Sequence, residues 1–388
     1  MKDRVYQGRK IAIFAGYYHP TIGGYIKNIH ELARRLCKKG YSVDVITCNT
    51  ENAALHELID GVSVYRIPSW DILGGNYPIP KLSFTSLKMI LAISRKDYDV
   101  INTQTRFFFI CFIGWTISKL KGIPLIHLER GTRHSVLESE ITTFIGRLYD
   151  HTIGTLIVKT SSSNLGVSKP AVEFMKHLGA KDGKVMYNGI DVSMFENNEP
   201  VIKGLDIDNY NSSVTVTFIG RLIYAKGMQD LITIFPELKG RVRLLIVGEG
   251  SYRKELEKLT KKVDKRDIIF LGSKKVEEIP SILNITDIVV NPSYSEGLPT
   301  SVMEACAAGR AVVATNVGGT NEIIQDGETG FLITPENLEE LKKRIDILIE
   351  NPGLRKELGS KAKEYVKKKF SWDEIVEKWV KEIGMVIK

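Results

Sequence analysis

Cysteine is scarce in this sequence, and long apolar runs are missing. The 388 residues include four cysteines and no Cys-x-x-Cys pair, which argues against a structural zinc site and against a disulfide framework. The N-terminal segment is basic but has no apolar core of about 7 to 15 residues, so we expect no secretory signal. The most apolar stretch, residues 107–117, is about half as long as the ~20 residues that cross a bilayer. We therefore expect a cytoplasmic protein without a membrane-spanning helix.

Sequence patterns for metals and for dinucleotides are missing as well. No His-Glu-x-x-His motif, clustered Asp pair or Cys/His set occurs, so we expect no metal ligands. Gly23 and Gly24 open the first predicted helix, but the turn lacks Gly-x-Gly-x-x-Gly. The second predicted strand ends in Asn49, where a nicotinamide enzyme prefers an acidic residue. An NAD(P)-dependent oxidoreductase is therefore the second hypothesis.

Positive charge is concentrated in the first half of the chain. The formal net charge is +8, and residues 1–200 hold 25 Lys and Arg against 18 Asp and Glu, a difference of +7. Residues 201–388 hold 29 against 28, a difference of +1. A basic half attracts anionic partners such as acidic lipid headgroups, although a solvated surface gives the same count. We hypothesise peripheral contact with an anionic membrane surface and expect no nucleic-acid partner.

Strand and helix patterns alternate along the chain. Residues 10–16 and 41–48 have strand patterns, and between them apolar residues recur at three- and four-residue steps in an amphipathic helix that Gly40 ends. This strand-helix-strand unit indicates parallel pairing with a right-handed crossover. Further apolar runs in the first half extend the sheet, at residues 99–104, 123–129, 155–162 and 165–168. The second half repeats the pattern at residues 214–220, 242–250, 268–272, 287–293 and 311–317.

The predicted fold class is α/β, with two Rossmann-like, doubly wound parallel sheets facing across a cleft. We predict an N-terminal domain over residues 1–195 and a C-terminal domain over residues 196–370, joined by the polar segment 196–213. Three helical stretches follow residues 330–337, and the last of them spans residues 371–388. Ligands bind outside the carboxyl ends of the strands in such sheets, so we look there for the site.

Two carboxylates follow a predicted strand of the second half. Glu296 lies on the loop after residues 287–293, and Glu304 lies in the first two turns of a helix that we expect to begin near Pro299. Carboxylates accept paired hydrogen bonds from vicinal hydroxyls, and the amides at a helix N-terminus suit a phosphate. A helix start that merely favours acids explains Glu304 but not the Gly-Leu-Pro turn beside Glu296. The pattern predicts binding of a polyhydroxylated, phosphorylated ligand.

Two cations follow the first strand of the second half. Arg221 can clamp a diphosphate through two hydrogen bonds and Lys226 can add a point charge, which together neutralise negative charge without a metal. In the first half, the segment "HLERGTRH" places Arg130 and His134 after a strand. A histidine on a strand, such as His127, is usually structural, whereas His134 on the loop is the better functional candidate.

These motifs resemble those of the retaining glycosyltransferases of family four, which have the GT-B fold. Residues 296–304, "EGLPTSVME", resemble the E-x7-E motif of that family, and residues 220–227, "GRLIYAKG", resemble its phosphate clamp. The glycine pair at 23 and 24 and the segments "NGID", "GEG" and "FSWDEI" also resemble family motifs. The resemblance covers nearly the whole chain, and it implies that the last helix, residues 371–388, returns to the first domain.

The resemblance implies an enzyme that moves a sugar from a nucleotide-diphosphate donor to a hydroxyl acceptor, with no metal and no cofactor. It implies that Arg221 and Lys226 bind the diphosphate, Glu304 the ribose and Glu296 the transferred sugar. The residues that it implies for donor binding are Gly23, Gly24, Arg221, Lys226, Gly248, Glu249, Gly297, Leu298, Pro299, Thr300 and Glu304. An epimerase or phosphorylase of the same fold remains a further alternative.

The resemblance also implies that the first domain binds the acceptor, which we expect to be a glycolipid, a lipid-linked saccharide or a polysaccharide precursor. The aromatic residues between Phe107 and Trp115 suggest a membrane contact, and a buried helix explains them equally well. Many relatives have a His-Gly pair where this chain has Arg130-Gly131, so Arg130 or His134 takes the acceptor-side role. No motif identifies the base or the sugar of the donor.

Overall fold

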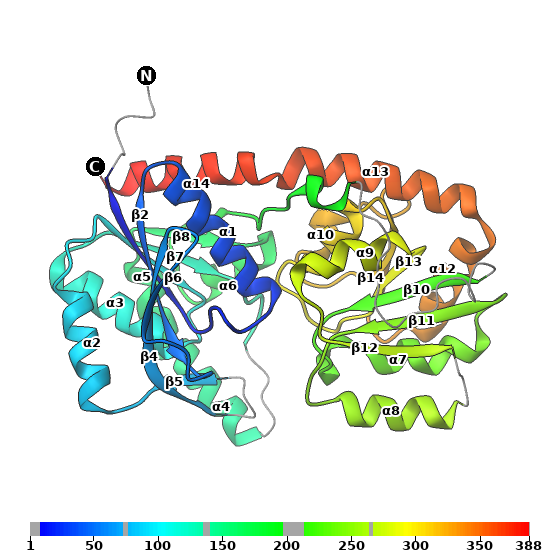
Figure 1. Cartoon of the computed structure of the whole chain (residues 1–388), viewed down its shortest axis with the longest axis horizontal. Coiled ribbons are helices and arrows are strands. Elements are labelled where there is room, and N and C mark those ends of the chain that lie inside the picture. Colours follow the sequence, from blue (N-terminus) through cyan, green and yellow to red (C-terminus); the bar gives the residue numbers. More distant parts are fainter. Residues whose placement is uncertain (1–7, 73–76, 135–139, 197–212, 264–266, 388) are drawn as a thin grey trace. The chain divides into compact units, whose positions relative to one another are not determined.

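The structure is a computed structural model that describes residues 8–72, 77–134, 140–196, 213–263 and 267–387. Contacts divide the chain into two units, Met1–Asn188 with Asp373–Lys388, and Gly189–Trp372 (Figure 1). The boundaries proposed from the sequence, after residues 195 and 370, differ from these by seven and two residues. The predicted linker 196–213 lies almost wholly outside the described residues.

The first unit is built on a nine-stranded sheet with the order β3-β4-β2-β1-β6-β7-β8-β9, and β5 pairs with β4. Its strands are β1 Lys10–Ala15, β2 Ser42–Asn49, β3 His56–Ile59, β4 Val62–Ile72, β5 Tyr77–Pro80, β6 Val100–Gln104, β7 Leu125–Glu129, β8 Ser163–Gly166 and β9 Lys184–Val185. All neighbours are parallel except β3 and β5, which run antiparallel to β4. This mixed edge was not predicted from the sequence. The strand order reverses between β1 and β6.

Helices cover both faces of this sheet. They are α1 Gly24–Lys38, α2 Phe84–Ser94, α3 Phe109–Lys121, α4 Glu140–Tyr149, α5 Thr155–Thr160 and α6 Lys169–His177. Figure 1 shows α2 and α3 on one side of the sheet and α1 on the other. Phe14, Ile101 and Ile110 belong to the core under α2 and α3. The aromatic stretch 107–117 therefore supplies a packed helix, as the second of its two interpretations proposed.

One strand prediction in the first unit is wrong. Residues 155–162 were expected to form a strand, but they begin with helix α5, which continues from a π-helical turn, η2 (Asp150–Gly154). Ile157 and Val158 are buried while the flanking Lys159 and Thr160 are exposed, which is a one-sided helical pattern too short to separate from a strand by periodicity. The strand, β8, follows instead at Ser163.

The second unit has a six-stranded, fully parallel sheet with the order β12-β11-β10-β13-β14-β15. Its strands are β10 Val214–Ile219, β11 Val242–Val247, β12 Ile268–Gly272, β13 Ile288–Asn291, β14 Ala311–Thr315 and β15 Phe331–Ile333. Its helices are α7 Met228–Ile234, α8 Arg253–Lys262, α9 Ile279–Asn284, α10 Thr300–Ala307, α11 Thr320–Ile323, α12 Leu338–Glu350 and α13 Pro352–Phe370. The strand order reverses between β10 and β13, so the loops after these two strands diverge to opposite faces and leave a crevice.

The last helix, α14 (Trp372–Val386), belongs almost entirely to the first unit. Glu382 is buried there and accepts hydrogen bonds from Ser163 Oγ at 2.6 Å and from Lys184 Nζ at 3.0 Å. Where the chain enters and leaves the second unit, the Ile190 amide donates to the Phe370 carbonyl at 2.8 Å. Among the described residues, no helix is long and apolar enough to span a membrane.

Candidate functional site

The residues singled out in the second unit gather at the strand reversal between β10 and β13. Arg221 follows β10, and Lys226 ends the short 3-10 helix η5 (Tyr224–Lys226) on the same loop. Glu296 lies on the loop that leaves β13. Lys226 Nζ lies 2.6 Å from Glu296 Oε1, although 70 positions separate the two residues in the sequence. The structure thus brings one predicted cation and one predicted carboxylate into direct contact, while Arg221 is exposed on the loop that carries Lys226.

Asn291, which the sequence reasoning missed, orients the Glu296 carboxylate. The Asn291 Oδ1 atom accepts hydrogen bonds from Ser293 Oγ at 2.5 Å and from the Ser293 amide at 3.3 Å. Its Nδ2 atom is thereby turned toward Glu296 Oε1, at 3.4 Å, and Ser301 Oγ, at 3.5 Å. Thr315 Oγ1 donates to the Ser293 carbonyl at 2.5 Å and ties this turn to β14. The only sequence signal was the polar "NPS" at the end of an apolar strand.

Glycines let the loops around Glu296 approach one another. Gly318 has a φ of +55°, and a Cβ atom there would lie 1.9 Å from the Glu296 carbonyl oxygen. Gly227 has a φ of +65°, and its Cβ would lie 2.0 Å from the Pro292 carbonyl oxygen. The Gly319 amide donates to the Gly297 carbonyl at 2.8 Å. Glycine is needed at both positive-φ positions because a side chain would force the loop that carries Glu296 to move.

Two tyrosines line the same loops. The Tyr294 hydroxyl donates to Asp230 Oδ1 at 2.9 Å and accepts from Gln229 Nε2 at 2.7 Å. Burial and the neighbouring Asp230 carboxylate raise the pKa of Tyr294 far above its usual range. The Tyr294 ring meets the exposed Tyr224 ring edge to face, with centroids 5.5 Å apart. These contacts bind the end of the β13 loop to the start of α7, so they fix the turn from which Glu296 projects.

The helix after Glu296 begins where the sequence predicted. Pro299 is the N-cap of α10, whose first residue is Thr300. Glu304 is the fifth residue of α10 and is buried, and Leu298 is buried as well. No side chain caps the first turn of this helix. The loop that carries Glu296 leads directly into these uncapped first amides of α10, and uncapped amides at a helix N-terminus suit an anion.

The 248–250 turn after β11 has a structural reason for its glycines. Gly248 has a φ of +139°, and a Cβ there would lie 1.9 Å from the Gly220 carbonyl oxygen. The Leu222 amide donates to the Glu249 carbonyl at 2.9 Å, while the Glu249 side chain pairs with Arg253 on the next helical turn. The turn thus supports the Arg221 loop through its backbone. A direct donor contact for Gly248 and Glu249 stays a prediction.

In the first unit, the glycine pair and Arg130 lie near one another. Gly23 is the N-cap of α1, and a Cβ built there meets nothing within 4 Å, so packing does not require glycine at this position. Tyr25, one residue after Gly24, lies under the Arg130 guanidinium, 5.1 Å from its ring centroid. Arg130 also donates to Gln104 Oε1 at 3.0 Å and to Asn188 Oδ1 at 2.8 Å. Burial lowers the pKa of Arg130 to about 10.

A buried ion network connects the Arg130 loop to His134. Burial raises the pKa of Glu129, but Arg106, 2.8 Å away, and His127 together outweigh burial and hold that pKa well below its usual range. Arg106 also donates to both oxygens of Asp150, at 2.8 and 3.0 Å. Asp150 in turn accepts from His134 Nδ1 at 2.7 Å. The His134 ring is thus directed toward Asp150, whereas Arg130 is the residue placed beside the α1 glycines.

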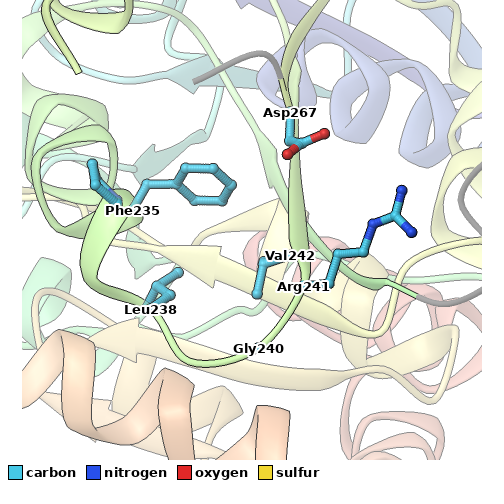
Figure 2. A pocket seen from close by; sticks show the side chains of 7 residues that line it. Phe235, Leu238, Gly240, Arg241, Val242 and Asp267 are labelled. Carbon is cyan, nitrogen blue, oxygen red and sulfur yellow. The ribbon is translucent and has the colours of Figure 1, made fainter. Parts of the chain in front are cut away.

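A surface pocket of about 330 Å³ lies elsewhere in the second unit (Figure 2). Leu238, Gly240 and Val242 line it, together with Asp267. Val242 is the first residue of β11, so the pocket lies at the amino ends of the strands, opposite the edge that carries Lys226 and Glu296. No residue singled out from the sequence lines this pocket.

Comparison with protein families gives two matches that together span most of the chain. Residues 22–194 match the family described as "Glycosyltransferase Family 4", and residues 207–365 match "Glycosyl transferases group 1". The two matched segments correspond closely to the two units of the structure.

Individual relatives align over similar lengths. An uncharacterized glycosyltransferase of Methanocaldococcus jannaschii is 32% identical over 96% of this chain and 97% of its own length. The N,N'-diacetylbacillosaminyl-diphospho-undecaprenol alpha-1,3-N-acetylgalactosaminyltransferase of Campylobacter jejuni is 27% identical over 71% of this chain and 72% of its own. The structure of HepE from Anabaena in complex with UDP-glucose superposes with a TM-score of 0.77 at 21% identity, over 97% of this chain and 99% of that one.

Proposed function

Because this chain belongs to glycosyltransferase family 4, a family of retaining enzymes that use nucleotide-sugar donors, we propose that it transfers a sugar to a lipid-linked hydroxyl acceptor. Family membership and the GT-B fold confirm the resemblance drawn from the sequence and set the NAD(P) oxidoreductase hypothesis aside. The donor is assigned to the second unit and the acceptor to the first. The observation that carries the donor assignment is the 2.6 Å contact between Lys226 and Glu296 at the strand reversal.

The charges at this edge suit a diphosphate that leaves a sugar. Arg221 and Lys226, with the leading amides of α10, stabilise negative charge that grows on the departing diphosphate, and interactions that strengthen in the transition state lower the barrier. Glu296 holds hydroxyls of the transferred sugar, and Glu304 holds those of the ribose. The bond from the sugar to the diphosphate breaks while the acceptor oxygen bonds to the same face, and the acceptor proton passes to the departing phosphate oxygen. Two fixed cations make a catalytic metal unnecessary for this step.

Exposed apolar stripes in the first unit favour a membrane-bound acceptor. Phe84, Leu87 and Leu91 share one face of α2 at helical spacing, and Phe84 is 82% exposed. Helix α4 has a second stripe, formed by Ile141, Phe144, Ile145 and Leu148. An exposed apolar stripe on a basic half is the pattern of a helix that lies in the headgroup region of an anionic membrane. The lipid-linked substrate named for the Campylobacter relative agrees with this assignment.

The donor is tested first with UDP-glucose, which is bound in the HepE structure. We expect UDP-glucose, or another sugar nucleotide in the same panel, to raise the melting temperature, because a ligand that binds the native state stabilises it by mass action. Lys226→Met removes the effect, whereas Lys239→Met keeps it. Lys239 is the matched control because its 2.8 Å pair with Glu350 lies on the surface of the same unit. Equal stabilisation of both variants, or none by any sugar nucleotide, contradicts the donor assignment.

The chemistry and the acceptor have separate tests. With a polyprenyl-diphosphate saccharide as acceptor, turnover continues in excess chelator and the product keeps the anomeric configuration of the donor. If turnover is lost in chelator and added Mg²⁺ restores it, the metal-free assignment is contradicted.

For the membrane contact, sedimentation with phosphatidylglycerol vesicles is compared for wild type, Phe84→Ser/Leu87→Ser and Leu58→Ser. Leu58 is the control because it is an equally apolar, exposed residue on β3. Failure to bind these vesicles at any salt concentration rejects the membrane contact alone.

A further inference from the structure

Three histidines that are distant in sequence meet at one surface of the first unit. His134 follows β7, His151 lies in the π-helical turn η2, and His177 is the last residue of α6. One ligand nitrogen from each lies within 4.8 Å of the other two. The His134 ring centroid lies 4.9 Å from that of His151 and 5.6 Å from that of His177. The chain has seven histidines, so nearly half of them gather at this point.

The partner of His134 presents one of its nitrogens to the cluster. His134 Nδ1 donates to Asp150 Oδ2 at 2.7 Å, which leaves Nε2 with the lone pair that binds a metal. Asp150 is fully buried and is fixed by two hydrogen bonds from Arg106. A histidine that donates its other N–H to a carboxylate is the usual outer contact of a metal-ligating imidazole, since it sets the tautomer and the ring orientation. This ring is therefore held before any ion arrives.

The π-helical turn η2 carries both the carboxylate and the second imidazole. Asp150 and His151 are consecutive, yet Asp150 is buried and His151 is exposed beside His134. Single π-helical turns are rare and occur frequently at functional sites. Phe174 packs against His134, with centroids 5.1 Å apart, and is nearly parallel to His177, so one apolar ring orders two of the three imidazoles.

We propose that His134, His151 and His177 bind one divalent transition-metal ion, with Zn²⁺ as the expected occupant. Imidazole nitrogens suit Zn²⁺, and three of them leave a fourth position for water or an external ligand. Zn–N distances of about 2.0–2.1 Å require nitrogens about 3.4 Å apart in a tetrahedral site. The exposed side chains of His151 and His177 can close the remaining gap by rotation alone. The ion would join the loop that begins at Arg130 to η2 and α6.

This site is separate from the transfer chemistry proposed for the second unit, and the sequence predicted no metal ligands. The three residues belong to no local motif, because 17 and 26 positions separate them along the chain. A metal here stabilises the acceptor-side unit and does not activate the donor. Removal of the ion is thus expected to lower the melting temperature of the first unit without changing the anomeric outcome of transfer.

The test uses the full chain without a polyhistidine tag, after dialysis against a chelator. We expect Zn²⁺ to bind with a single saturable stoichiometric step in calorimetry and to raise the melting temperature, and Co²⁺ to give the visible absorption of a four-coordinate site. His151→Ala/His177→Ala is expected to weaken Zn²⁺ binding by ~100-fold or more, because two of three ligands are lost. These two side chains are exposed, so the variant should fold.

His56→Ala is the matched control, since His56 is exposed on β3, where it stacks on Tyr65. It should bind Zn²⁺ with the wild-type affinity. The proposal is overturned if the wild-type chain takes up no stoichiometric Zn²⁺, if the double variant binds as tightly as wild type, or if His56→Ala weakens binding to the same extent.

Discussion

Gly318 offers a sharp test of how the Glu296 carboxylate is positioned. Its φ is +55°, and a Cβ atom there would lie 1.9 Å from the Glu296 carbonyl oxygen and 2.7 Å from the carbonyl carbon. Contacts of a Cβ under 3.0 Å are essentially never found, so Gly318→Ala must displace the peptide after Glu296 by at least 1.1 Å, the difference between 3.0 and 1.9 Å. The atoms nearest to this Cβ are backbone atoms, which no rotamer change can move aside.

The expected loss of stability follows from two contributions. A left-handed conformation costs a non-glycine residue roughly 1–2 kcal/mol, and loss of the hydrogen bond from Gly319 to Gly297 costs about 1 kcal/mol more. We therefore expect Gly318→Ala to destabilise the second unit by about 2–3 kcal/mol. A displacement of about 1 Å at a reacting group lowers the rate by up to ~100-fold, so kcat/KM should fall by that order.

Gly327→Ala separates backbone strain from displacement. Gly327 has a φ of +75° in the same unit, but a Cβ built there meets nothing within 4 Å. This variant should therefore lose roughly 1–2 kcal/mol and keep its activity. Calorimetric melting and kcat/KM for the nucleotide sugar are measured on both variants. If Gly318→Ala and Gly327→Ala lose the same stability and Gly318→Ala keeps the wild-type kcat/KM, the peptide after Glu296 moves without consequence. The positioning argument would then be wrong.

Three further predictions concern ion pairs. The pKa of Glu129 is lower in the folded state than its ordinary value of 4.5, so the ionised carboxylate stabilises the fold fully above pH 4.5 and progressively less below it. The difference in unfolding free energy between wild type and Glu129→Gln should therefore narrow from pH 5 to 3. Glu382→Gln should cost ~1–3 kcal/mol and Glu377→Gln, an exposed partner of Lys39, ~0–1 kcal/mol in denaturant unfolding; equal losses contradict the role of burial. The double variant Lys226→Met/Glu296→Gln should lose less unfolding free energy than the two single variants lose together, because each single change leaves a mostly buried partner unpaired. Additive losses of unfolding free energy would refute this.

Strong periodicity made much of the fold predictable. The helix that was expected to end at Gly40 is α1, and its apolar stripe is buried. Strands β10 to β14 of the second unit lie where continuous apolar runs were found, because parallel strands are buried on both faces, whereas β15 was not predicted. Pro299 marks the start of α10, since proline is suited to the first turn of a helix. Strands β3, β4 and β5 were missed because half-exposed strands give a weaker apolar signal.

The site was predictable only in part. The types of residue and their positions after strands indicated that Lys226 and Glu296 would converge, because the carboxyl ends of parallel strands meet at one edge. The role of Asn291 depends on hydrogen bonds from Ser293 that fix the direction of its amide, and no spacing in the sequence encodes them. The glycine at 318 is required by a contact with a loop more than twenty positions earlier, which is likewise invisible in the local sequence.

Both proposed sites arise because the topology brings distant short segments together. Lys226 and Glu296 meet because β10 and β13 are neighbours at the reversal of strand order, so the two loops must emerge side by side. The pair is mostly buried, and replacing a buried ion pair with apolar groups of similar volume is often neutral or stabilising. Stability alone is thus a poor reason for a lysine and a glutamate at this position. The same reasoning applies to the π-helical turn that carries His151 beside two other imidazoles, because such turns are rare and frequently lie at functional sites. In both places a ligand is the simpler physical reason.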